Sequence, residues 1–206
     1  MNIVEYSAGL WFVIYKGNYR ILRKSGYYTV NGITLWRVVM APLIIFLAIK
    51  GDEALFKWLL AISFLTDAVD GTLARWYHIS SKIGARLDSV GDDLTILAGF
   101  AGMLVFHFDF VRQELVLLII LAVFWLLQVM LALYRYGKMT AFHTVLAKGA
   151  AILQAMFLLA LFFWPEAEKL LFYAAAALTL LDLAEEIVLV LLLREWRSDV
   201  KGLYWL

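Results

Sequence analysis

Four aspartates, Asp67, Asp70, Asp88 and Asp92, lie within a short stretch of otherwise apolar sequence. An ionised carboxylate in such a setting is costly unless a cation compensates its charge. Four carboxylates in one place would repel each other, so cations are expected to hold them. Mg²⁺ commonly sits between protein carboxylates and substrate phosphates. The segment therefore predicts metal-assisted phosphoryl transfer at a membrane surface.

The spacing of these acids predicts that they come from two neighbouring helices. Asp67 and Asp70 are three residues apart and share one helix face. Gly84, Asp88 and Asp92 follow at intervals of four, again along one face. A short loop would make the two helices antiparallel neighbours, so the acidic faces can meet. Oxygen ligands suit Mg²⁺ and Mn²⁺, and a chain without Cys lacks the ligands of softer metals.

Small residues accompany the acids. Gly71, Ala74 and Gly84 remove bulk beside them, which leaves room for a ligand against the helix backbone. Arg75 follows one turn after Gly71 and can pair with a carboxylate or a phosphate. For the glycines alone, tight helix packing in a membrane explains the small residues equally well.

The composition indicates an integral membrane protein. The 206 residues are 64% hydrophobic and 17% charged, with a mean hydropathy of +0.83. Soluble domains are about half apolar and about a quarter charged. The length suits a single domain over residues 1–206. The net charge of +1 gives no sign of an acidic partner, and we expect no nucleic-acid binding.

An all-α fold with six transmembrane helices is predicted, because each span needs about 20 mostly apolar residues. Breaks such as Gly51-Asp52 and Trp164-Pro165-Glu166 separate the candidates. The predicted spans are residues 30–49, 54–76, 84–107, 113–136, 142–164 and 168–194.

The placement of Lys and Arg predicts the orientation. With both termini cytoplasmic, 14 of the 18 Lys and Arg residues fall on the inner side. The four on the outer side are Lys50, Lys57, Arg112 and Lys169. This multi-pass topology puts the acidic segment near the cytoplasmic face and makes residues 195–206 a cytoplasmic tail.

Residues 1–28 mix apolar and aromatic side chains with Lys and Arg, and their apolar run is too short to span a membrane. We expect an amphipathic helix lying in the cytoplasmic interface, with its cations near anionic head groups. The alternative is a basic leader that only sets the topology.

One spacing resembles the signature of a known enzyme family. The pattern D-x2-D-G-x2-A-R-x8-G-x3-D-x3-D is that of the CDP-alcohol phosphotransferases. Residues 31–42, which include Thr34 and Arg37, are similar to the first-helix pattern of that family. All eight fixed positions of the signature are present: Asp67, Asp70, Gly71, Ala74, Arg75, Gly84, Asp88 and Asp92.

The resemblance implies a six-helix fold, usually a homodimer, and a CDP-linked donor whose pyrophosphate meets two divalent ions, Mg²⁺ or Mn²⁺. By the same carry-over, Asp92 is the general base. The implied metal ligands are Asp67, Asp70, Asp88 and Asp92. The implied nucleotide-binding residues are Thr34, Asp67, Asp70, Gly71, Ala74, Arg75 and Gly84.

The implied reaction is attack of an acceptor hydroxyl on the donor phosphorus, with departure of CMP. The cations between Arg135 and Lys148 are interpreted mainly as the positive charges that set the membrane orientation. Binding of an anionic acceptor is the alternative. The candidate acceptor-binding residues are Arg86, Lys138, His143 and Lys148.

Three further acids, Asp182, Glu185 and Glu186, fall inside the sixth predicted span. Such acids are usually paired or functional. A structural or dimer-contact role is favoured over acceptor binding. The candidate partners are Arg37, Arg135, Lys148 or Arg194.

The acceptor alcohol stays open. Asp93 and Ser89 stand where phosphatidylglycerophosphate synthases tend to have Lys and Pro, and the run 87–89 is closer to inositol-phosphate or serine types. CDP-diacylglycerol is the preferred donor, with a CDP-choline or CDP-ethanolamine enzyme acting on diacylglycerol as the alternative. Two other classes stay open, a membrane cation transporter and a catalytically silent scaffold.

Overall fold

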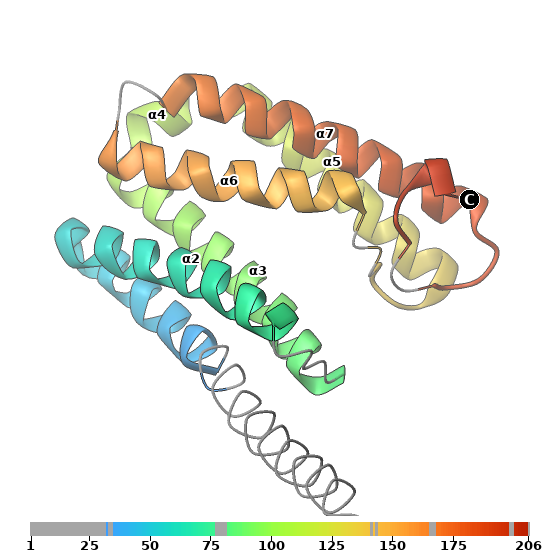
Figure 1. Cartoon of the computed structure of the whole chain (residues 1–206). Coiled ribbons are helices and arrows are strands. Elements are labelled where there is room, and N and C mark those ends of the chain that lie inside the picture. Colours follow the sequence, from blue (N-terminus) through green and yellow to red (C-terminus); the bar gives the residue numbers. More distant parts are fainter. Residues whose placement is uncertain are drawn as a thin grey trace, which may run out of the picture. The chain divides into compact units, whose positions relative to one another are not determined.

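The computed structural model describes residues 32, 35–76, 82–140, 142, 144–164, 168–197 and 200–205, with the backbone alone at 70–76 and 82–89. The regular structure in these ranges is entirely helical, which confirms the predicted all-α class for this part of the chain (Figure 1). The predicted interfacial helix at 1–28 lies outside the described residues. After a helix at 35–50, the elements are α2 (Glu53–Trp76), α3 (Lys82–Phe106), α4 (Phe108–Gln113), α5 (Leu115–Tyr136), α6 (Val145–Phe163), α7 (Glu168–Leu192) and the 3-10 turn η2 (Leu203–Trp205).

Each predicted span overlaps one long helix of the described residues, although most of the start of the first span, at 30–34, lies outside them. Helix α4 is the one described α-helix that the sequence did not predict. Within the described ranges, two helices are long and apolar enough to cross a membrane, α5 and α6. Most of α5 faces outward: Val116, Trp125 and Met130 are all at least half exposed. An apolar helix with so little burial suits a lipid environment. Crossing by the other four helices stays a prediction.

The chain divides into two compact units, residues 1–98 and 99–206. The described part of the first unit includes a helical hairpin that turns at Gly51 and Asp52. Gly51 has a positive φ of 76°, and the amides of Gly51 and Asp52 donate to the carbonyls of Ala48 (3.0 Å) and Leu47 (3.1 Å). This pattern ends a helix at a left-handed glycine. The Asp52 carboxylate then accepts from the Leu55 amide at 3.1 Å and caps α2.

The second unit packs α6 against α7 and α5 against α7 (Figure 1). At one end of these helices, Phe110, Phe157 and Phe172 form a buried cluster with ring centroids 5.2–5.7 Å apart. The close approach of α3 to α6 depends on Gly99, because a Cβ there would come within 2.6 Å of Leu158 Cδ1.

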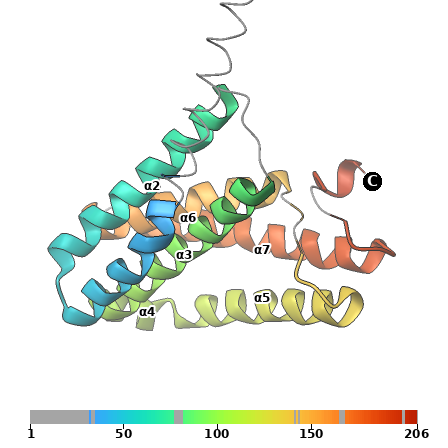
Figure 2. The ribbon, with the colours of Figure 1, turned by 90° about the horizontal axis from the view of Figure 1, so that it is seen from below.

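The chain after α7 folds back onto the second unit. The Leu203 amide donates to Glu185 Oε1 at 2.9 Å, and the Val145 amide donates to the Lys201 carbonyl at 3.2 Å. Val200 and Leu203 pack against a buried cluster that includes Phe142. Residues 200–205 therefore form a docked segment, with η2 beside the end of α7 (Figure 2).

Candidate active site

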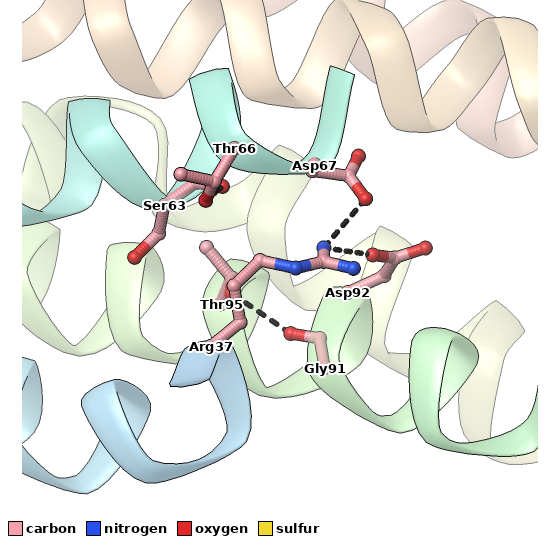
Figure 3. Close-up of polar contacts among 7 residues, drawn as sticks. All are labelled: Arg37, Ser63, Thr66, Asp67, Gly91, Asp92 and Thr95. Carbon is pink, nitrogen blue, oxygen red and sulfur yellow. Dashed lines mark hydrogen bonds and ion pairs between the residues drawn. The ribbon is translucent and has the colours of Figure 1, made fainter. Parts of the chain in front are cut away.

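One nitrogen of Arg37 joins two of the signature aspartates. Nη1 of Arg37, on the helix at 35–50, lies 2.5 Å from Asp67 Oδ1 on α2 and 2.5 Å from Asp92 Oδ1 on α3 (Figure 3). The Arg37 side chain is 1% exposed, whereas those of Asp67 and Asp92 are 41% and 42% exposed. A buried guanidinium thus holds together two carboxylates that are accessible from outside.

The packing around Arg37 explains how it reaches both acids. Gly91 is buried against Arg37, and a Cβ there would lie 3.7 Å from Arg37 Cζ and from Val38 Cγ2. One turn later, the buried Thr95 hydroxyl donates to the Gly91 carbonyl at 2.8 Å. This bond satisfies the hydroxyl inside the helix, which is how buried polar side chains are normally accommodated. The side of α3 that carries Asp92 is therefore anchored against the helix at 35–50.

The donor set fits a divalent cation. Two carboxylate oxygens from different helices already converge on a single cationic nitrogen, and hard divalent ions prefer such oxygens. Asp70 lies three residues after Asp67 on α2, and Asp88 lies four residues before Asp92 on α3. Both helices are continuous there, so each backbone position shares a face with its partner. Among the side chains that the structure describes, no group of three His, Cys, Asp or Glu residues is arranged to hold a metal ion, and Asp70 and Asp88 are outside that set.

The other predicted site residues fall into three groups: six on α2 and α3, two lysines of the second unit, and two residues outside the described ranges. For the six on α2 and α3 the structure describes the backbone alone, whereas Lys138 and Lys148 of the second unit are exposed. Lys138 Nζ lies 5.4 Å from the centroid of the Trp196 ring. Thr34 and His143 lie outside the described residues. The roles predicted for all of these residues stay predictions; the six on α2 and α3 are Gly71, Ala74, Arg75, Gly84, Arg86 and Asp88.

The sequence does not predict this role of Arg37; it predicts a cation that sets the membrane topology and a candidate partner of the α7 acids. The structure instead gives it Asp67 and Asp92 as partners. The available signal was the cation itself, because a charge inside an apolar helix requires a partner.

The prediction that Arg135, Lys148 or Arg194 pairs with the acids on α7 is wrong. Asp182 accepts from the Thr144 hydroxyl at 3.0 Å, and Glu186 accepts from Gln128 Nε2 at 2.7 Å. Glu185 accepts from the Leu203 amide. These acids therefore accept hydrogen bonds from hydroxyl, amide and backbone groups, where cations were expected. The donors reach them because the connection from α5 to α6 and the docked segment fold over α7. The three cations expected from this unit, Arg135, Lys148 and Arg194, are exposed.

Comparison with known proteins agrees with the signature. A family model described as CDP-alcohol phosphatidyltransferase matches residues 27–181. The chain belongs to this family.

Two curated relatives are similar over a limited segment. A CDP-diacylglycerol--inositol 3-phosphatidyltransferase of Saccharomyces cerevisiae is 44% identical over 66 residues, which is 32% of this chain and 30% of the yeast protein. A probable cardiolipin synthase (CMP-forming) of Drosophila melanogaster is 40% identical over 65 residues, 31% of this chain and 20% of the fly protein. The chain thus spans less than a third of the length of these relatives. No solved structure matches.

Proposed function

We propose that this protein is a phospholipid-synthesising transferase that moves a phosphatidyl group from a CDP-alcohol to an acceptor hydroxyl and releases CMP. The observation that carries the proposal is the convergence of Asp67 and Asp92 from two helices on one cation. Membership of the CDP-alcohol phosphatidyltransferase family supports the same reaction. Both relatives also carry names of CDP-dependent or CMP-forming enzymes.

The proposed metal ligands are Asp67, Asp70, Asp88 and Asp92, for two Mg²⁺ or Mn²⁺ ions. Ions bound there supply positive charge that stabilises the phosphoryl oxygens and the departing CMP. Two helices then contribute two carboxylates each, and the exposure of Asp67 and Asp92 leaves their oxygens open to a ligand.

Asp92 is the proposed general base. The acceptor oxygen forms a bond to the phosphorus that carries the alcohol of the donor, and the bond from that phosphorus to the CMP oxygen breaks. The hydroxyl proton passes to the Asp92 carboxylate, which must lie within hydrogen-bond reach of the acceptor. With 42% of its side chain exposed, Asp92 is accessible for this step.

The nucleotide is proposed to lie where the helices carry small residues, against Gly71, Ala74 and Gly84, with Thr34 and Arg75 as further contacts. CDP-diacylglycerol is the proposed donor, and its lipid tails require a site that opens to the bilayer. Acceptor contacts are proposed at Arg86, Lys138, His143 and Lys148.

The proposed setting is a multi-pass membrane protein with cytoplasmic termini and an active site near the cytoplasmic face. The outward-facing apolar surface of α5 supports a membrane location. A homodimer is proposed from the family resemblance.

The experiment that tests the proposal supplies purified protein with CDP-diacylglycerol, Mg²⁺ and one acceptor at a time, and measures CMP. The panel is glycerol phosphate, inositol phosphate, inositol and serine, with CDP-choline plus diacylglycerol as a separate arm. We expect CMP release that depends on one acceptor of the first set. Release in the CDP-choline arm alone would replace the proposed donor, and cation flux in liposomes without CMP release in any arm would overturn the enzymatic proposal.

A further inference from the structure

Arg37 occupies carboxylate oxygens that a divalent ion at the proposed site would also use. Its Nη1 contacts Asp67 Oδ1 and Asp92 Oδ1 at 2.5 Å each (Figure 3). We propose that Arg37 is an internal counter-cation, which neutralises these two acids in the metal-free protein and gives way when a divalent ion binds. This inference rests on the proposed function, because that function requires the ion.

The burial of the three side chains gives the two cations different routes to the same acids. Arg37 is 1% exposed and approaches from within the packed helices. Asp67 and Asp92 are 41% and 42% exposed, so an ion and its substrate can reach them from outside. Arg37 therefore meets the shared oxygens from the interior side, and the exposed parts of the two carboxylates stay open to an ion and to substrate.

The charges fix the direction of the effect. A guanidinium and a divalent ion that share two carboxylates repel each other strongly at a few ångströms. Arg37 therefore weakens metal binding, and loss of its charge should strengthen binding roughly tenfold. Without metal, loss of that charge leaves two close carboxylates without this partner and destabilises the protein. A purely structural arginine would instead weaken both stability and metal binding when it is replaced.

The experiment uses the full chain in detergent and compares wild type with Arg37→Gln, which removes the charge, and Arg37→Lys, which keeps it. Mn²⁺ is the probe: free Mn²⁺ is measured by electron paramagnetic resonance during a titration, and thermal unfolding is followed in EDTA and in saturating Mn²⁺. For Arg37→Gln we expect a lower melting temperature in EDTA, a larger stabilisation by Mn²⁺ and a roughly tenfold lower Kd for Mn²⁺. For Arg37→Lys we expect values close to wild type, because a single nitrogen makes both contacts.

Several results would overturn the inference. If wild type binds Mn²⁺ and Asp67→Asn weakens that binding, but Arg37→Gln binds no more tightly than wild type, the inference fails while the proposed metal site stands. If wild type binds no Mn²⁺, the proposed metal site fails and the inference fails with it. An Arg37→Gln protein that cannot be recovered folded even in Mn²⁺ also contradicts the inference, because the ion should replace the missing charge.

Discussion

Asp67 on α2 and Asp92 on α3 meet at one atom, the Nη1 nitrogen of Arg37, which lies 2.5 Å from each carboxylate. A buried guanidinium is tolerated only when its charge is compensated. The two acids therefore hold three helices of the first unit together, besides any role they have in binding a ligand.

The first prediction concerns this charge balance. The double variant Asp67→Asn/Asp92→Asn removes two carboxylate partners of the buried Arg37 and should lower the free energy of unfolding by up to roughly 3–5 kcal/mol. Each single variant should lose much less, because the other carboxylate still compensates the guanidinium. The melting temperatures of the three variants, followed by tryptophan fluorescence in EDTA, measure this. The prediction would be contradicted if the double variant lost only a little stability, equal to the sum of the losses in the two single variants.

The second prediction uses two glycines of α3 as a matched pair. A Cβ at Gly99 would lie 2.6 Å from Leu158 Cδ1, whereas a Cβ at Gly91 would lie 3.7 Å from its nearest neighbours. Gly99→Ala should therefore destabilise the protein by roughly 1–3 kcal/mol. Gly91→Ala should be neutral or stabilising by up to about 1 kcal/mol, because alanine favours a helix.

Thermal unfolding compares the two variants. Adding Leu158→Ala to Gly99→Ala should remove the clash, so that only the cost of the cavity left by Leu158 remains. Equal effects of the two glycine substitutions would show that close approach to Leu158 is unimportant.

The third prediction concerns the docked segment at residues 200–205. Gly202 has a φ of +140°, and a Cβ there would lie 2.8 Å from Glu185 Oε1. Gly202→Ala combines backbone strain with a clash against the carboxylate that accepts from Leu203. We expect it to release the segment and to cost roughly 1–3 kcal/mol.

Limited trypsin digestion at Arg197 and Lys201 measures the release. Gly137→Asn is the control, since Gly137 has a φ of +66° with no heavy atom within 4 Å of an added Cβ, and Asn tolerates that conformation. Protection of the docked segment in Gly202→Ala equal to that in wild type would show that docking does not depend on the glycine at this position.

The helices of this protein could be predicted well from the sequence, and the reasons are local. Long apolar runs mark the helices, and Gly51-Asp52 ends one helix and caps the next by hydrogen bonds between close neighbours in the chain. Helix α4 was missed because six residues between two breaks carry too little periodicity. Its place depends on Phe110, which packs against α6 and α7.

Contacts between side chains far apart in the chain could be predicted only in part from the sequence. The spacing of the aspartates predicted that Asp67 and Asp92 lie on facing helices, and the structure brings these two together. Their cation was not predicted, because the contacts of Arg37 cross the interfaces between three helices. The partners of Asp182 and Glu185 were missed for the same reason, since Thr144 and Leu203 reach them only after the chain has folded back.

The fourth prediction concerns catalysis. Asp92→Asn should lower the rate of CMP release by roughly 10²–10⁴-fold, because an amide cannot accept the hydroxyl proton. Asp109→Asn is a matched control: Asp109 lies exposed in the first turn of α4, outside the signature. Steady-state CMP release from CDP-diacylglycerol and the active acceptor measures both. Wild-type turnover by Asp92→Asn would remove the proposed base.

The proposed metal site is tested most directly by the dependence of CMP release on a divalent ion. Wild-type protein is freed of metal with EDTA, assayed with CDP-diacylglycerol and acceptor, and then assayed again after Mg²⁺ or Mn²⁺ is restored in excess. We expect no release in EDTA, full recovery with either ion, and no recovery for Asp67→Asn/Asp92→Asn. Undiminished release in EDTA, or recovery in that double variant, would contradict the assignment of these aspartates as the ligands of a catalytic metal.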